Sequence, residues 1–451
     1  MTATPMQLCE QVLDVVGGRA EAQVTAQQSR PALTRFANSF IHQNVAESAS
    51  SVQLKLALPD GRVATASTTR VDGDGLAALV EGALAAAALR PVDPDWPGLA
   101  PPAPVPDVDH YDPATEAASP DERARRVRAF IDAGPGLRAA GFCDTDGGTT
   151  AFANSAGQRA EGRSTRATID GIHQTDDSAG SGHATAARLS DLDAGGVGAA
   201  AADRARRSSA AADIEPGEYE VVLEPECVAT ILIFLAFYGF NAKQVLEGQS
   251  GIRPGEAQFD PAVSIWDDAT AAAALGVPFD ADGTPKRRLD LVRSGVSTAL
   301  AHDRRTARRM GAGAESTGHA VGESDSYGAI PSNLFLGPAD PSFGAGTADL
   351  VAAVDRGLLV TTFNYCRILD PKTQVVTGLT RNGTFLIEDG QVKGGVKNLR
   401  FTQSFIEALG PGNVLGISRE ARFADSEFGP GLVHCPAVRL GSFRFTGGAR
   451  G

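Results

Sequence analysis

The chain has 451 residues and a formal net charge of -13, with 54 Asp and Glu against 41 Lys and Arg. This acidic balance argues against binding to nucleic acids or anionic membranes, because both depend on an excess of Lys and Arg. The length predicts two or three domains with a sizeable core. Five scattered cysteines are typical of reduced thiols, and we find no signal peptide and no apolar run long enough to cross a bilayer, so we expect a cytoplasmic protein.

The first predicted domain, residues 1–110, combines helices with a hairpin. An amphipathic helix is expected around Met6–Val16. Apolar residues alternate over 52–58, a Pro-Asp-Gly turn follows, and Val63–Thr69 returns as the second strand. Leu76–Leu89 has helical spacing and is expected to pack on that hairpin. The proline-rich stretch Pro91–Pro113 then predicts a linker or an extended crossing segment.

The second predicted domain, residues 111–215, begins with a helix. Ser119 is a suitable N-cap, Pro120 stands at the first helical position, and acidic residues fill the first turn. Short strands follow, including Thr165–Ile169, and Ala199–Ala212 predicts a helix that ends before a Pro-Gly pair. The rest, residues 216–451, predicts a β-rich domain with an Asp-Gly hairpin turn at 389–390. The fold class is therefore α+β, with N-terminal α/β modules followed by a β-rich C-terminal domain.

The most continuous apolar run in the chain is Val228–Phe240, directly after a predicted strand at Tyr219–Leu223. It is too short for a membrane-spanning helix, which needs about 20 apolar residues, and it is therefore expected to be a core helix. It contains no His, Asp, Glu or Cys. This absence bears on the function expected of the chain.

Several short motifs follow one another in a characteristic order. They are Arg35-Phe36-Ala37-Asn38, Gly217-Glu218-Tyr219 leading into the next strand, Pro278-Phe279-Asp280 with Asp282-Gly283, Ser316-Thr317-Gly318-His319-Ala320, and the run from Asn382 to Gly390. In these motifs the chain resembles the TldD/PmbA (TldE) family of modulator-of-gyrase proteins from about residue 30 to its C-terminus.

The resemblance implies a heteromeric, cytoplasmic zinc peptidase in which only the TldD-type subunit holds zinc. In that subunit a helix presents a His-Glu-x-x-x-His motif, whose imidazoles bind the metal while the Glu acts as general base. In this chain the corresponding segment is 233–240, and no side chain in it can bind zinc. We therefore expect no metal or cofactor in this chain and zinc in a partner subunit. The residues of this vacated metal-motif helix are Ile233, Phe234, Phe237, Tyr238 and Phe240.

Two other groups are weaker candidates for a functional site. Ser316, Thr317, Gly318 and His319 form a glycine-containing loop that could line a substrate cleft, although a structural turn is the more ordinary interpretation. His434 and Cys435 lie where the zinc-bearing subunit is expected to supply a cysteine ligand, but neighbouring residues in a strand point to opposite faces, which favours packing over a joint catalytic role.

Three charged patterns have simpler interpretations. Asp280 and Asp282 could form an acid–base pair, but such residues more often cap turns. The stretches 72–75 and 144–147 have the composition of calcium loops but lack the closing Glu, so we interpret both as turns. Four arginines at 304, 305, 308 and 309 predict a basic helix face that is exposed to solvent or to a partner.

The leading hypothesis is a non-catalytic subunit, inactive alone, that completes the substrate cleft of a zinc-bearing TldD-type partner in a heterodimer or higher assembly that processes or degrades peptides. The first alternative is a stand-alone, metal-independent amide hydrolase or transferase that uses Cys435 or His319 in a peptide-derived metabolite pathway. The second is a peptide-binding scaffold. The residues do not identify the substrate.

Overall fold

A computed structural model describes residues 3–322, 324–338 and 345–448 of the chain. Its first half is built on one long antiparallel sheet of eight strands in the order β3-β2-β6-β1-β4-β5, with β7 pairing β6 and β8 pairing β7. The strands are β1 (Glu21–Ser29), β2 (Ala32–Ala37), β3 (Phe40–Ala46), β4 (Ala49–Ala57), β5 (Val63–Thr68), β6 (Arg138–Asn154), β7 (Arg159–Gln174) and β8 (Ala179–Ala186).

Strand β6 joins the two predicted N-terminal ranges in this sheet. Its first half pairs with β2 and its second half with β1, so a strand of the range 111–215 pairs directly with strands of the range 1–110. On its other side β6 pairs with β7 over almost its whole length. The division of the chain into domains at 1–110, 111–215 and 216–451 stays a prediction.

The predicted elements at the N-terminal end of the sheet are confirmed. The hairpin is β4-β5, with Ala57 opposite Val63. Helices α1 (Pro5–Val16) and α2 (Gly73–Ala88) share an apolar core with β1 and β4. Asp72 caps α2 by accepting a hydrogen bond from the N–H of Gly75 at 2.7 Å. The interpretation of 72–75 and 144–147 as turns is wrong, because the first stretch begins α2 and the second pairs with β7 inside β6.

At the other end of the sheet lie α4 (Pro120–Asp132) and α5 (Ala194–Arg207), with the short α3 (Pro113–Glu116) and η1 (Leu189–Asp191) beside them. Ser119 caps α4 in a capping box with Glu122, as the sequence indicates. Helix α5 lies so close to β8 that a Cβ on Gly180 would stand 2.2 Å from the carbonyl oxygen of Ala201. Glycine is therefore required for this approach.

The C-terminal part forms a second sheet of thirteen strands around helix α6 (Pro225–Phe234), and its predicted β-rich character is confirmed. Its strands are β9 (Gly217–Leu223), β10 (Val263–Asp267), β11 (Leu289–Arg293), β12 (Val296–Ser297), β13 (Leu334–Pro338), β14 (Arg356–Val360), β15 (Phe363–Asp370), β16 (Val375–Thr380), β17 (Thr384–Glu388), β18 (Gln391–Gly395), β19 (Leu399–Ser404), β20 (Val414–Ser426) and β21 (Gly429–Gly448). Its other helices are η2 (Leu235–Gly239), α7 (Ala242–Leu246), α8 (Arg304–Met310), α9 (Ser324–Tyr327), α10 (Thr347–Ala352) and α11 (Phe405–Ala408).

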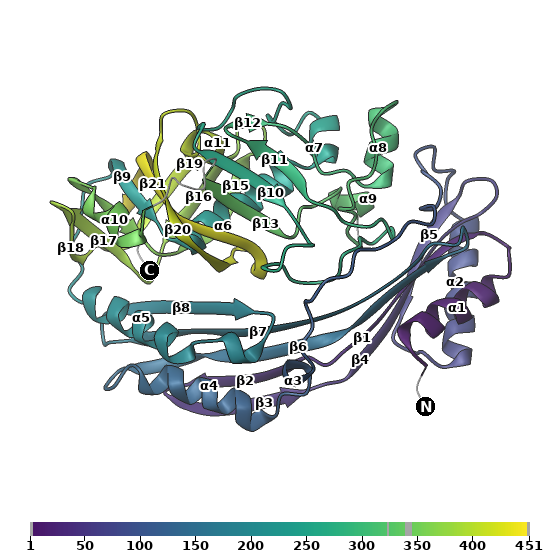
Figure 1. Ribbon diagram of the computed structural model, residues 1–451, viewed down its shortest axis with the longest axis horizontal. Coiled ribbons are helices and arrows are strands. Elements are labelled where there is room, and N and C mark those ends of the chain that lie inside the picture. The colour runs from purple at the N-terminus through teal and green to yellow at the C-terminus, as the bar shows by residue number, and fades with distance from the viewer. Residues whose placement is uncertain (1–2, 323, 339–344, 449–451) are drawn as a thin grey trace.

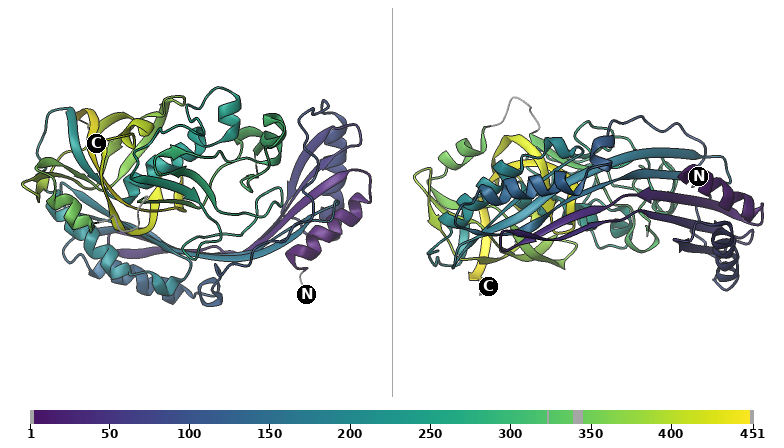
Figure 2. Two further views of the ribbon diagram at one scale, coloured as in Figure 1. Left: turned by 45° about the horizontal axis from the view of Figure 1, so that its top comes forward. Right: turned by 90° about the horizontal axis from the view of Figure 1, so that it is seen from below.

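The long sheet is curved, and the C-terminal domain lies in its concavity while α1, α2 and α4 lie on the outside (Figure 1, Figure 2). Contacts join the two layers at both ends of the sheet. Near one end Gln23 of β1 donates a hydrogen bond to Asp282 at 3.1 Å, and near the other end β20 meets β8. Within the described residues, no helix is long and apolar enough to span a bilayer.

The arginines around α8 contact the proline-rich crossing segment, so the predicted exposed face is confirmed only for Arg308 and Arg309, while Arg304 and Arg305 are partly buried against that segment. Arg304 donates to the carbonyl oxygen of Leu99 at 2.9 Å, and Arg308 donates to that of Trp96. Arg305 forms a two-pronged ion pair with Asp93. The sequence could not indicate these contacts, because the segment and the helix are some 200 residues apart.

Candidate functional site

One face of strands β7 and β8 carries polar side chains toward the C-terminal domain. Alternation along β8 turns Gly180 and Gly182 toward α5, which leaves Ser181, His183 and Thr185 on the opposite face. Asp170 of β7 stands directly opposite His183 in the antiparallel ladder. Antiparallel pairing therefore brings the two side chains together on the face that the C-terminal domain covers.

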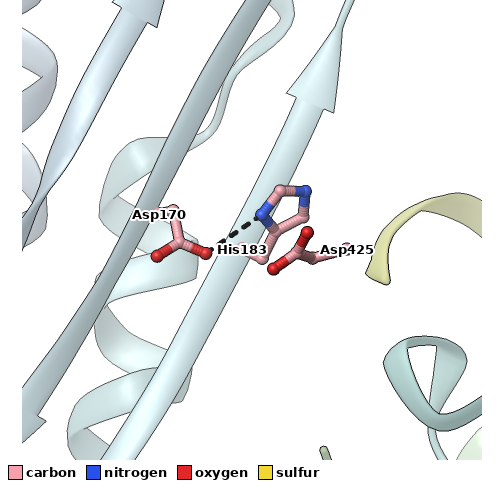
Figure 3. Close-up of side chains that lie close together, drawn as sticks. All are labelled: Asp170, His183 and Asp425. Atoms are coloured by element: carbon pink, nitrogen blue, oxygen red, sulfur yellow. Dashed lines mark hydrogen bonds and ion pairs between the residues drawn. The ribbon is translucent and has the colours of Figure 1, made fainter. Parts of the chain in front are cut away.

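The β20-β21 hairpin adds a third group. The ladder between these strands is irregular between Ala424 and Ser426, so Asp425 lies at a bulge, a feature that commonly redirects a side chain. Figure 3 shows the Asp425 carboxylate and Asp170 on either side of His183. One ligand atom from each of the three residues lies within 4.8 Å of the other two.

Both ring nitrogens of His183 have polar neighbours. Nδ1 lies 3.2 Å from a carboxylate oxygen of Asp170, and Nε2 lies 3.0 Å from the hydroxyl of Thr185. The His183 side chain is only 5% exposed, whereas that of Asp170 is 36% exposed. The cluster is thus closed on the histidine side and open to solvent at Asp170.

Two ion pairs flank the cluster at the beginning of α6. Both carboxylate oxygens of Glu226 accept hydrogen bonds from Arg422, at 2.6 and 2.8 Å, and Glu224 pairs with Arg204. Burial acts to lower the pKa of His183, but the hydrogen bond to Asp170 and the surrounding carboxylates raise it overall. Burial also raises the pKa of Asp425 to about 6, although His183 opposes the shift. The site is therefore rich in negative charge.

A separate cavity of about 290 Å³ lies between the sheet and the C-terminal domain. Its lining includes Asp146, Arg166, Lys286 and Gly431, and the last of these lies close to both Arg166 and Thr185. One carboxylate oxygen of Asp146 and Nε of Arg166 are buried without a hydrogen-bond partner among the described residues. This cavity offers both signs of charge to a polar ligand.

Comparison with known proteins relates this architecture to a family. The family model for the PmbA/TldA metallopeptidase C-terminal domain matches residues 216–447. The chain belongs to this family. The resemblance found from the motifs is thereby confirmed, and the matched range begins at β9 and contains α6.

Two curated relatives are named as metalloproteases. The chain is 30% identical over 146 residues to a metalloprotease of Methanocaldococcus jannaschii, which is 32% of each protein. It is 25% identical over 229 residues to a metalloprotease of Methanothermobacter thermautotrophicus, which is 50% of this chain and 48% of the relative. These matches therefore span half or less of each relative.

Solved structures share the whole fold at low sequence identity. TldE from Thermococcus kodakarensis matches with a TM-score of 0.86 and 18% identity over 99% of this chain and all of its own. A Thermotoga maritima protein named as a modulator of a DNA gyrase matches with a TM-score of 0.83 and 18% identity over 98% of this chain and all of its own. At this identity the likeness concerns the fold alone.

Aromatic side chains fill the segment in which the family resemblance places the zinc motif. Helix α6 ends at Phe234 and continues as one π-helical turn, Leu235–Gly239, a form often found at functional sites. Phe234 and Phe237 pack against Phe428 of the β20-β21 turn, with ring centroids 5.6 and 4.8 Å apart. Tyr238 stacks on Phe234 at 6.0 Å. Aromatic packing occupies this position, and no side chain there offers a metal ligand.

Ile233 and Phe240, the remaining residues of the vacated metal-motif helix, are fully buried in the core of the C-terminal domain. Their side chains contribute to packing around α6. The assignment of this helix as a former metal site rests on the family resemblance and stays a prediction.

The predicted cleft loop is divided between the surface and the interior. Ser316 lines a cavity of about 660 Å³ beside the proline-rich segment. His319 is fully buried, with Nδ1 2.9 Å from the hydroxyl of Thr317 and Nε2 3.0 Å from Asp267, an ion-pair contact without hydrogen-bond geometry. Gly318 has a positive φ of 79° and lies against the backbone of Pro285. A role for these residues in a substrate cleft stays a prediction.

His434 and Cys435 face opposite sides of β21. The imidazole of His434 lies between the rings of Phe335 and Phe423, at 5.4 and 5.3 Å. Cys435 is fully buried, its sulfur lies 3.3 Å from the carbonyl oxygen of Pro225, and burial raises the pKa of its thiol far above the ordinary value. A thiol in this environment stays protonated and is a poor nucleophile.

Sequence reasoning did not single out Asp170, His183 or Asp425. The alternation of polar residues along β7 was a usable signal for a wet face, but the histidine and the two acids come from three strands in two parts of the molecule. No spacing motif could connect them.

Proposed function

We propose that this chain is the non-catalytic subunit of a heteromeric TldD/TldE-type peptidase and completes the substrate cleft of a zinc-bearing partner. The proposal rests on the side chains at 233–240, none of which can bind zinc. Where the zinc-bearing subunit is expected to present two histidines and a glutamate, this chain packs Phe234 and Phe237 against Phe428. The overall likeness to TldE of Thermococcus kodakarensis also supports it.

A surface above this helix has the composition of a protein interface. Phe428 is 46% exposed and Tyr365 is 66% exposed. Arg367 links them, since its guanidinium stacks on the ring of Tyr365 at 4.5 Å and lies 3.4 Å from Glu427. Aromatic residues and arginine are enriched at the centres of interfaces. We assign this surface, Tyr365, Arg367 and Phe428, to contact with the zinc-bearing partner.

An adjoining strand edge suits an extended peptide. Among the described strands β15 pairs only with β16, so its other edge keeps free N–H and C=O groups. A peptide can add to such an edge as a further strand, with backbone hydrogen bonds providing affinity. Because β15 carries Tyr365, a peptide bound there would lie between this chain and the partner.

The test compares the chain alone with the chain co-expressed with a zinc-bearing family member from the same genome. We expect peptide hydrolysis by the pair and none by either this chain alone or its mixture with free zinc. Phe428→Glu should reduce co-purification of the partner and activity together, while Leu89→Glu, a change at the 90% exposed leucine that follows α2, should change neither. Hydrolysis by the isolated chain at a rate close to that of the pair would refute the proposal.

The stand-alone hydrolase or transferase and the peptide-binding scaffold stay hypotheses. The environment of Cys435 does not favour the first, because its thiol is buried and protonated. Unchanged activity in Cys435→Ser and in a folded variant at His319 would exclude it. Recovery of unrelated proteins, rather than a zinc-bearing relative, from a native pull-down would favour the scaffold.

A further inference from the structure

The cluster of Asp170, His183 and Asp425 has no role in the function proposed above. We propose that these three residues bind one divalent first-row transition-metal cation between the N-terminal sheet and the C-terminal domain. This site is separate from the vacated metal-motif helix, and it revises the expectation that the chain holds no metal. The inference concerns the isolated chain and does not depend on the partner.

The geometry of the three ligand atoms is close to that of a bound cation. Zinc binds imidazole nitrogen and carboxylate oxygen at about 2.0–2.2 Å, so neighbouring ligand atoms in a tetrahedral site stand roughly 3.4 Å apart. Nδ1 of His183 and the oxygen of Asp170 already lie 3.2 Å apart. The full set lies within 4.8 Å, so a small rotation of the Asp425 side chain would complete three protein ligands.

The charges of the side chains in and around the cluster favour a divalent cation. Glu226 uses both carboxylate oxygens on Arg422, and Glu224 is paired with Arg204, so these two acids are already neutralised. Among the described residues the Asp425 carboxylate forms no ion pair, and that of Asp170 pairs with no charged group other than His183. Two carboxylates therefore face one imidazole, and a cation of charge two would neutralise both.

Hydrogen bonding around His183 favours the tautomer and ring orientation that a metal-binding histidine needs. A cation on Nδ1 requires the proton on Nε2, and Nε2–H can donate to the hydroxyl of Thr185 at 3.0 Å. The hydroxyl of Thr185 in turn lies 3.2 Å from that of Thr168. Metal-binding histidines commonly donate their second N–H in this way, which fixes the tautomer and the ring orientation.

The ligand set and its access narrow the choice of ion. One imidazole and two carboxylates suit zinc, manganese or iron better than calcium or magnesium, which prefer oxygen alone. The partial exposure of Asp170 leaves a path from solvent. All five cysteines are buried in the folded chain and should not compete for the ion. A bound ion would tie the β20-β21 hairpin to β7 and β8.

The experiment titrates the full-length, tag-free chain, first treated with EDTA, with Zn²⁺ and separately with Mn²⁺ in a calorimeter. We expect one ion per chain for at least one of the two metals. His183→Gln and Asp425→Asn should each weaken binding at least tenfold, and Thr185→Val should weaken it less. His42→Gln and Asp176→Asn, changes at an exposed histidine and an exposed aspartate, should bind like the wild type.

Thermal unfolding provides a second measurement for variants whose fold must be verified. A saturating ion should raise the unfolding temperature of the wild type and both control variants, because it binds the folded state alone, and should not raise that of Asp425→Asn. Absence of stoichiometric binding by both metals would overturn the inference and leave a proton-bridged ion pair at this place. Binding that survives both His183→Gln and Asp425→Asn unchanged would overturn it equally.

Discussion

Removal of the buried imidazole of His319 provides a direct test of whether that residue is structural. The side chains of His319 and Asp267 are both fully buried, with Nε2 and the carboxylate oxygen 3.0 Å apart. The other oxygen of Asp267 accepts the N–H of Asn333 at 2.6 Å. Burial acts to raise the pKa of Asp267, but His319 outweighs it and holds this pKa below the ordinary value, so the carboxylate is charged at neutral pH.

In His319→Ala the carboxylate of Asp267 keeps its backbone hydrogen bond but loses the imidazole that faces it inside the protein. Breaking a buried pair in this way costs about 3–5 kcal/mol. With an m-value of about 3 kcal/mol/M, the urea midpoint should fall by roughly 1–1.7 M. In the double variant Asp267→Asn/His319→Ala no charge is left unpaired, so stability should partly return.

The assay is urea unfolding at pH 7.5, followed by fluorescence and circular dichroism. His42→Ala, at an exposed histidine of β3, is the matched control and should unfold with the wild type. A His319→Ala chain with an unchanged midpoint would refute the structural role. A double variant no more stable than His319→Ala would refute the buried charge as the cause.

Two further changes test the crossing segment and a buried acid pair. Arg305→Ala removes the ion pair with Asp93, so it should lower the free energy of unfolding by about 2 kcal/mol and speed protease cleavage within 91–112. The control is Arg288→Ala, a change at an exposed arginine. Equal cleavage of the two variants would contradict the contact between Arg305 and the crossing segment. Burial and the charge of Asp282 raise the pKa of Asp280 to about 7. The folded chain therefore holds a proton that the unfolded chain releases above about pH 4. The free energy of unfolding should fall as pH rises from 4 to 7. Asp282→Asn should therefore raise the urea midpoint at pH 8 with little effect at pH 5, and a uniform effect at both would contradict this assignment.

Local sequence signals predicted single elements well because each rests on neighbouring residues. The cap at Ser119, the hairpin at 52–69 and the core helix after β9 depend on turn chemistry, alternation and apolar runs within a few residues. The same signals failed at 144–147, where Asp and Gly within a long strand have the composition of a loop. There pairing with β7 overrides the local preference.

The amino-acid sequence by itself determined the α+β class, the β-rich C-terminal part and the apolar helix without metal ligands, because these follow from periodicity and composition. The tertiary structure alone decided which distant side chains meet. The arginines of α8 donate hydrogen bonds to carbonyl groups of the proline-rich segment, and Asp425 lies close to His183. Both contacts form because the C-terminal domain lies in the concavity of a sheet made by the first half of the chain. Long-range contacts of this kind leave no spacing pattern along the chain, since each partner satisfies only local rules on its own strand or helix.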